Sequence, residues 1–143
     1  MDFLDVNVLV NAFRPDMPRH REFLHYVQSL IESDQPYAIS SVVFSGLLRI
    51  VTHPKIFNRP NELRDARKFA DQLRSPAHFV PIEPGPRHWE LFLGLCERGN
   101  ARGPMISDAL LAAIAIEAGA ELVTDDRGFG RWPGLRWRHA VDD

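Results

Sequence analysis

Three aspartates stand where a short apolar run meets a predicted helix or turn. Asp5 follows the run at 3–4, Asp108 lies in the first turn of a predicted alanine-rich helix, and Asp126 follows the run at 122–124. Sites in open parallel sheets form beyond the carboxyl ends of the strands, near helix starts, so we expect these carboxylates to converge. Like charges in one pocket raise one another's pKa unless a cation joins them. Because Mg²⁺ and Mn²⁺ prefer oxygen ligands, the pattern predicts a site for a hard divalent metal.

Each aspartate also has a purely structural interpretation. An aspartate at a helix start, such as Asp108, is typical of a cap, and the pair Asp125-Asp126 after a strand is typical of a turn. Asp5 fits such an interpretation less well, because a charge at a buried strand-to-helix junction is costly unless it is paired or ligated. The occurrence of all three in this order favours the functional interpretation.

The elements that would position these residues alternate between strand and helix. Apolar runs and breakers predict strands at 3–6, 37–40, 79–82, 121–124 and 135–139, the third and fifth at sheet edges, and helices at 7–13, 23–31, 41–51, 61–73, 86–96 and 108–118. Asn61 is the expected cap of the fourth helix, and Trp89 is expected in the core. The alternation predicts a three-layer α/β/α fold with a short, mostly parallel sheet. The length predicts a single domain over residues 1–143.

Composition limits the class of protein. The 143 residues carry a formal net charge of −2, which argues against a domain that wraps duplex DNA through a strongly basic surface. The single cysteine cannot form an internal disulfide, and the start of the chain lacks the basic residues of a signal peptide. With no apolar run long enough to span a bilayer, we expect a cytoplasmic protein without a membrane partner.

Four blocks of sequence form a joint pattern: LDVNVLV from Leu4, ISSVV from Ile39 with LRIVTHP from Leu48, ISDALLAA from Ile106, and LVTDDRGF from Leu122. Taken together, these blocks resemble PIN-domain ribonucleases, and above all the VapC toxins of type II toxin–antitoxin pairs. The resemblance extends from residue 1 to residue 139. It implies the PIN fold and an endoribonuclease that hydrolyses RNA phosphodiester bonds with Mg²⁺, for which Mn²⁺ can substitute.

The resemblance also assigns roles to individual residues. Asp5, Asp108 and Asp126 match the catalytic acids, with Asp5 and Asp108 as the metal ligands. Asn7 and Thr124 match positions that orient the acids or the attacking water. A metal held there would polarise a phosphate oxygen and lower the pKa of a water, and the expected products carry a 5′-phosphate and a 3′-hydroxyl.

Partners follow from the same resemblance. It implies a homodimer and a cognate VapB-type antitoxin, and an apolar groove between helices is where a partner helix would dock. The expected groove residues are Phe13, Phe23, Leu24, Phe44, Leu47 and Leu48. For Arg49 and for the tail that contains Trp132, Trp137, Arg136 and Arg138, both RNA contact and a purely structural role stay open.

Two positions depart from the family pattern. Gly46 stands where many relatives carry a glutamate, and Gly128 stands where many carry a second aspartate in the fourth block. Gly46 either vacates a ligand position or allows two helices to approach closely. The departures keep an alternative open, a non-catalytic PIN-like module that binds RNA or protein. A phosphoryl-transfer α/β domain is the other alternative, although Lys55 and Lys68 are not placed for its chemistry.

Overall fold

The computed structural model describes residues 1–141, in which strands and helices alternate as predicted. The strands are β1 (Asp2–Leu4), β2 (Tyr37–Ile39), β3 (Phe79–Pro81), β4 (Glu121–Thr124) and β5 (Trp137–His139). The helices are α1 (Val6–Phe13), α2 (His20–Glu32), α3 (Ser41–Val51), α4 (Leu63–Arg74), α5 (His88–Arg98) and α6 (Pro104–Ala118), with a short 3₁₀ helix η1 (Arg127–Arg131).

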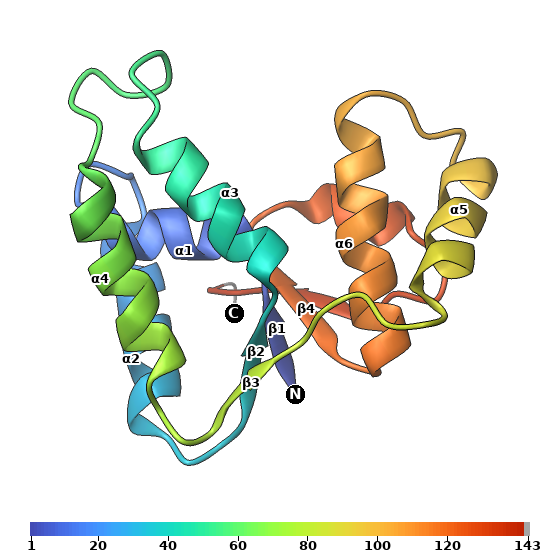
Figure 1. Cartoon of the computed structure of the whole chain (residues 1–143), viewed down its shortest axis with the longest axis horizontal. Coiled ribbons are helices and arrows are strands. Elements are labelled where there is room, and N and C mark those ends of the chain that lie inside the picture. Colours follow the sequence, from blue (N-terminus) through green and yellow to red (C-terminus); the bar gives the residue numbers. More distant parts are fainter. Residues whose placement is uncertain (142–143) are drawn as a thin grey trace.

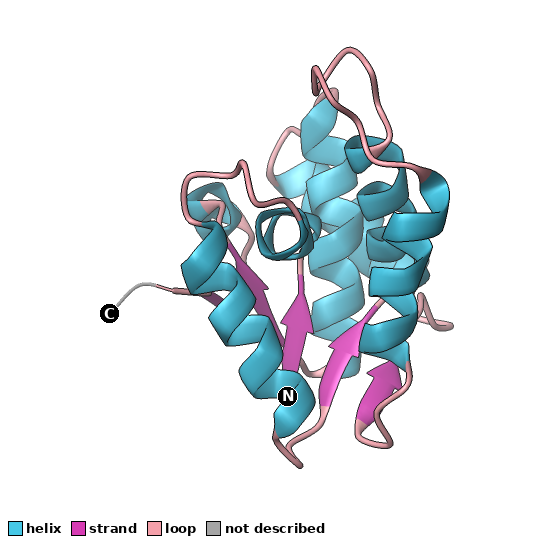
Figure 2. Cartoon of the chain, turned by 90° about the vertical axis from the view of Figure 1, so that its left-hand side faces the viewer, coloured by secondary structure: helices cyan, strands magenta, loops and turns pink. Residues whose placement is uncertain are grey.

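Within these residues, five strands form one sheet in the order β3-β2-β1-β4-β5. Every neighbouring pair is parallel, so the sheet is wholly rather than mostly parallel, and Figure 2 shows the arrowheads pointing the same way. The predicted edge positions of β3 and β5 are confirmed. The chain builds outward from β1 to β3 and then returns to β4 on the other side of β1. The carboxyl ends of β1 and β4 therefore flank the point where strand order reverses, the usual ligand position in such sheets.

Helices cover both faces of the sheet, which confirms the three-layer prediction. Figure 1 shows α1 to α4 on one side of the strands and α5 with α6 on the other. The central strands are buried on both faces, and Phe3, Leu4, Leu122 and Val123 have no exposed surface. Burial of such a side chain contributes roughly 1.5–3 kcal/mol, so the short strands are held mainly by the helices packed against them.

Helix α5 presents a different face to the core from the one predicted. Trp89 is 63% exposed, whereas His88, Phe92 and Leu95 are buried. The imidazole of His88 bonds to the carbonyl oxygen of Leu110 in α6 at 2.9 Å, which fixes the rotation of α5 against its neighbour. The prediction that Trp89 lies in the core was wrong because a polar contact, invisible to apolar periodicity, sets this rotation.

Two helix starts also differ from the prediction. Helix α6 begins at Pro104, a residue whose fixed φ suits a first turn, so Asp108 lies in the second turn and not in the first. At α4 the cap position is Glu62, because the carboxamide oxygen of Asn61 accepts a 2.7 Å hydrogen bond from the buried Arg14. In the part of the chain described, no helix has the length and apolar character needed to cross a membrane.

Candidate active site

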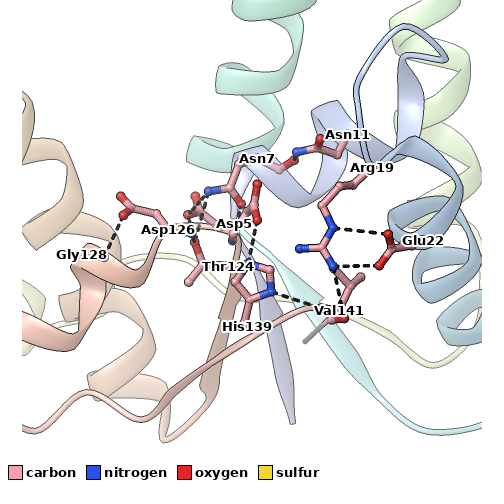
Figure 3. A network of polar contacts seen from close by, with 11 residues as sticks. Asp5, Asn7, Asn11, Arg19, Glu22, Thr124, Asp126, Gly128, His139 and Val141 are labelled. Atoms are coloured by element: carbon pink, nitrogen blue, oxygen red, sulfur yellow. Dashed lines mark hydrogen bonds and ion pairs between the residues drawn. The ribbon is translucent and has the colours of Figure 1, made fainter. Parts of the chain in front are cut away.

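Asp5 lies at the carboxyl end of β1, where the strand order of the sheet reverses, and the residue is only 7% exposed. One oxygen accepts from the backbone amide of Val6 at 2.6 Å and so caps α1. The other accepts from the Thr124 hydroxyl at 2.7 Å and from the Asn7 carboxamide at 3.3 Å. Figure 3 shows these side chains pointing toward one another where β1 and β4 end. The site thus holds a carboxylate that is buried and fixed in orientation.

Burial and neighbouring like charges raise the pKa values of two carboxyl groups at the site. Burial, together with the carboxylates of Asp108 and Asp126, raises the pKa of Asp5 to about 6, although the Thr124 and Val6 hydrogen bonds oppose the rise. Burial and the charge of Asp126 also raise the pKa of Asp108, against the lowering effect of Arg131. The three predicted acids are therefore brought into one electrostatically coupled group, which a cation would stabilise.

Thr124 and Asn7 connect the two strand ends. The Thr124 hydroxyl donates to Asp5, so its oxygen is left to accept from the Asn7 carboxamide at 3.2 Å and from the Asp126 amide at 3.0 Å. The Asn7 carboxamide oxygen accepts from the Asp125 amide at 3.0 Å. Both residues thus form hydrogen bonds to Asp5 and to the turn after β4.

The purely structural interpretation, a cap or turn role, applies to Asp126 but not to Asp108. Asp108 lies in the second turn of α6, so it does not cap the helix, and its half-buried carboxylate is close enough to Asp5 and Asp126 for their charges to interact. Asp126 caps η1, because one of its oxygens accepts from the Gly128 amide at 2.8 Å. Asp126 therefore has a turn role and retains a second oxygen at the exposed rim of the site.

One or two of these carboxylates suit a hydrated divalent cation. Among residues 1–141, no group of three or more Asp, Glu, His or Cys side chains is arranged so that it could hold a metal ion. Mg²⁺ keeps several waters and is commonly held by one or two carboxylates together with substrate phosphates, so a complete cage is not required. The raised pKa of the buried Asp5 carboxylate is the observation that favours a cation, because it marks negative charge without a counter-charge.

Sequence reasoning missed a histidine beside the site. The Nε2 of His139 lies 2.7 Å from a carboxylate oxygen of Asp125. Thr124 and His139 pair in register between β4 and β5. Only this pairing brings the tail next to the turn, and the sequence signal was no more than the alternation of an edge strand. Arg131 was also missed, and its charge acts on Asp108.

The structure distinguishes the two interpretations of Gly46. A Cβ at this position would lie 2.7 Å from a methyl group of Val6, which is closer than real Cβ atoms come to a neighbour. Gly46 therefore serves the close approach of α3 to α1. At Gly128 a Cβ would lie 2.9 Å from a carboxylate oxygen of Asp126 in the capping position that this oxygen adopts here.

We expect Gly46→Ala to lower the free energy of unfolding by about 1–2 kcal/mol, equally with Mn²⁺ and with EDTA, because β-branched Val6 has little freedom to move away. Gly94→Ala is the matched control, since a Cβ there meets only Arg98 at 3.7 Å. This variant should raise the free energy of unfolding by up to about 1 kcal/mol. Urea unfolding measures both. In the double variant Val6→Ala/Gly46→Ala, the Cβ at position 46 no longer meets the Val6 methyl groups, so the double variant should be about as stable as Val6→Ala alone. If the two losses of stability simply added, the packing role of Gly46 would be contradicted.

Comparison with known proteins identifies the family. The family model described as PIN domain matches residues 3–135. Ribonuclease VapC43 of Mycobacterium tuberculosis is 38% identical over 139 residues, 97% of this chain and 95% of that protein. Ribonuclease VapC25 of the same species is 38% identical over 136 residues, 95% of this chain and 96% of that protein. The crystal structure of VapBC2 from Rickettsia felis has the same fold, with a TM-score of 0.70 at 21% identity over 96% of this chain and 97% of that chain. The chain therefore belongs to the VapC family of PIN-domain proteins.

Proposed function

We infer that this chain is a divalent-metal-dependent endoribonuclease that acts as the toxin of a type II toxin–antitoxin pair, built as one PIN domain over residues 1–143. The observation that carries the inference is the buried Asp5 carboxylate at the sheet reversal, whose pKa is raised by burial and by Asp108 and Asp126. Relatives that are 38% identical over nearly the whole chain are named ribonucleases, which supports the same activity here.

The site residues have separable roles in this proposal. Asp5 and Asp108 would hold the metal, for which we propose Mg²⁺ with Mn²⁺ as a substitute. When bound, such an ion supplies positive charge to a phosphate oxygen and lowers the pKa of a water. Asp126, exposed at the rim, orients the attacking water. Thr124 and Asn7 keep the Asp5 carboxylate in one orientation through their hydrogen bonds.

The alternatives have less support. The non-catalytic module rests on the missing carboxylate at Gly46, which is missing whatever the packing there. Relatives that are 38% identical over nearly the whole chain are named ribonucleases, which favours an active enzyme. A phosphatase-like or receiver-like domain does not agree with membership of the PIN family.

The direct test is cleavage of a bacterial RNA pool by the purified chain. We expect fragments with 5′-phosphate and 3′-hydroxyl ends when Mg²⁺ or Mn²⁺ is present, and no fragments in excess EDTA. End-specific ligation of adaptors identifies the products. Cleavage that persists in EDTA would argue against the metal, and absence of cleavage with every RNA and metal tried would favour the non-catalytic alternative.

A VapB-type antitoxin is the proposed protein partner. Solved structures with the same fold include VapBC complexes from Rickettsia felis and Salmonella typhimurium. Of the expected groove residues, Phe23 and Leu47 are fully buried in the core, so they cannot line a docking surface. The remaining members line two grooves, one of about 400 Å³ that contains Phe13 and Leu24 and one of about 380 Å³ that contains Phe44 and Leu48. We propose that an antitoxin helix docks along these grooves.

We also propose that the chain forms a homodimer. Helix α5 leaves Trp89 63% and Leu93 37% exposed one turn apart, and we propose that this pair forms part of the dimer contact. Light scattering should give twice the chain mass of 16.3 kDa. Trp89→Ser should shift the mass toward the monomer, whereas Ile56→Ser, at a similarly exposed position after α3, should not. A monomer at all micromolar concentrations would contradict the dimer.

A further inference from the structure

A buried histidine and a carboxylate form a pair directly behind the acidic site. Nε2 of His139 lies 2.7 Å from a carboxylate oxygen of Asp125, and the two side chains are 7% and 34% exposed. The backbone alone already holds this edge of the sheet, since Thr124 and His139 pair in register and the Ala140 amide donates to the Thr124 carbonyl at 3.2 Å. Strand β4 ends at Thr124, so the side-chain bond gives the following turn residue, Asp125, an anchor that strand pairing does not supply.

From Asp125 the hydrogen bonds lead to Asp5. The Asp125 amide donates to the carboxamide oxygen of Asn7 at 3.0 Å. This bond fixes which end of the Asn7 carboxamide faces which neighbour, so its nitrogen faces the Asp5 carboxylate at 3.3 Å and the Thr124 hydroxyl at 3.2 Å. If the turn at Asp125 moved, its backbone amide would no longer hold the Asn7 carboxamide. The carboxamide could then rotate, and the Asp5 carboxylate would lose a donor.

The imidazole of His139 is itself held from the other side, as Figure 3 shows. Because a carboxylate oxygen can only accept, Nε2 is the donor to Asp125, and Nδ1 lies 3.4 Å from the Val141 amide. The Val141 carbonyl accepts from Arg19 at 3.4 Å, and the ring packs edge-on against Phe23 with centroids 6.4 Å apart. Helix α2, which carries Arg19 at its start and Phe23 within it, thus supports the ring that supports Asp125.

We propose that His139 is a positioning residue of the active site: it orients Asp125 and, through Asn7, holds the Asp5 carboxylate in the geometry that receives the metal. The His139–Asp125–Asn7 part of this inference stands on the hydrogen bonds alone. The metal part rests on the proposed function. Groups one layer behind the ligands of a metal commonly fix ligand orientation and affinity in this way.

The first experiment needs neither metal nor RNA. In EDTA, NMR hydrogen exchange should show the Asp125 amide and the Asn7 carboxamide exchanging about tenfold faster in His139→Phe, which keeps a ring against Phe23 but loses the donor. His139→Gln, whose side-chain amide can donate to Asp125, should restore slow exchange. His88→Phe is the matched control, because His88 is also buried but bonds to a carbonyl in α6. Unchanged exchange in His139→Phe would overturn the inference.

The second experiment separates positioning from general stability. Mn²⁺ affinity, measured by the EPR signal of free Mn²⁺, should weaken about tenfold in His139→Phe and stay near wild type in His139→Gln and His88→Phe, even where thermal melts show lost stability. Equal Mn²⁺ affinity in His139→Phe and His88→Phe, at equal loss of stability, would reduce His139 to a structural residue. Wild-type protein that neither binds Mn²⁺ nor cleaves RNA would defeat the proposed function, while the exchange rates would still decide whether His139 positions Asn7.

Discussion

Asp5→Asn and Asp108→Asn should each reduce RNA cleavage by at least about a hundredfold in the presence of Mg²⁺. The two carboxylates supply the negative charge that holds the cation, and a bound metal stabilises a phosphoryl transition state by several kcal/mol. Since each 1.36 kcal/mol changes a rate tenfold, loss of the metal accounts for a decrease of about two to three orders of magnitude. Initial rates on one labelled RNA, at saturating Mg²⁺ and in excess EDTA, measure the effect.

The fold of these variants provides the control. Neither substitution removes apolar packing, so circular dichroism should match the wild type and unfolding should stay cooperative. Asp34→Asn changes an exposed aspartate between α2 and β2, far along the chain from the site, and should cleave as fast as wild type. If Asp108→Asn kept wild-type cleavage while Asp5→Asn lost it, Asp108 would not be a ligand and the metal would depend on Asp5 alone.

The position of the site could be predicted because it depends on chain direction. In a parallel sheet every strand delivers its following residue to the same edge, so Asp5 after β1 and Asp126 after β4 had to approach one another once the strands were identified. Thr124 follows the same rule as the last residue of β4. The apolar runs of these strands are visible in the sequence, so this part of the site could be predicted from it.

Contacts between elements far apart in sequence could not be predicted in the same way. Gly46 is explained only by Val6, which is brought to it by the packing of α1 on α3. His139 meets Asp125 only because β5 pairs with β4 in one particular register, and a shift by one residue would turn its side chain to the other face. Helix rotation is equally non-local, since the His88 bond to α6 is what leaves Trp89 exposed.

The stability of the metal-free protein should fall as the pH rises from about 4 to 7. Asp5 has an ordinary pKa of 3.8 in the unfolded chain and a pKa of about 6 in the folded protein. Between these values the folded state keeps a proton that the unfolded state has released, so raising the pH favours unfolding. A difference of about two pKa units corresponds to a loss of about 3 kcal/mol, complete above the folded pKa. Asp108, whose pKa is also raised, adds to the loss in the same direction.

The comparison of wild type with Asp5→Asn isolates this contribution. Urea unfolding in EDTA at a series of pH values should show the wild type losing stability relative to Asp5→Asn as the pH rises, because the variant has no charge to bury. Carboxylates with lowered pKa values, such as Asp16, lose their contribution only at more acidic pH and cancel in the comparison. Saturating Mn²⁺ should remove most of the wild-type loss near pH 7, because the cation stabilises the ionised carboxylate and binds the folded state alone. Parallel curves of stability against pH for the two proteins in EDTA would show that the folded protein already compensates the charge of Asp5. That result would contradict the electrostatic argument for a metal at this site.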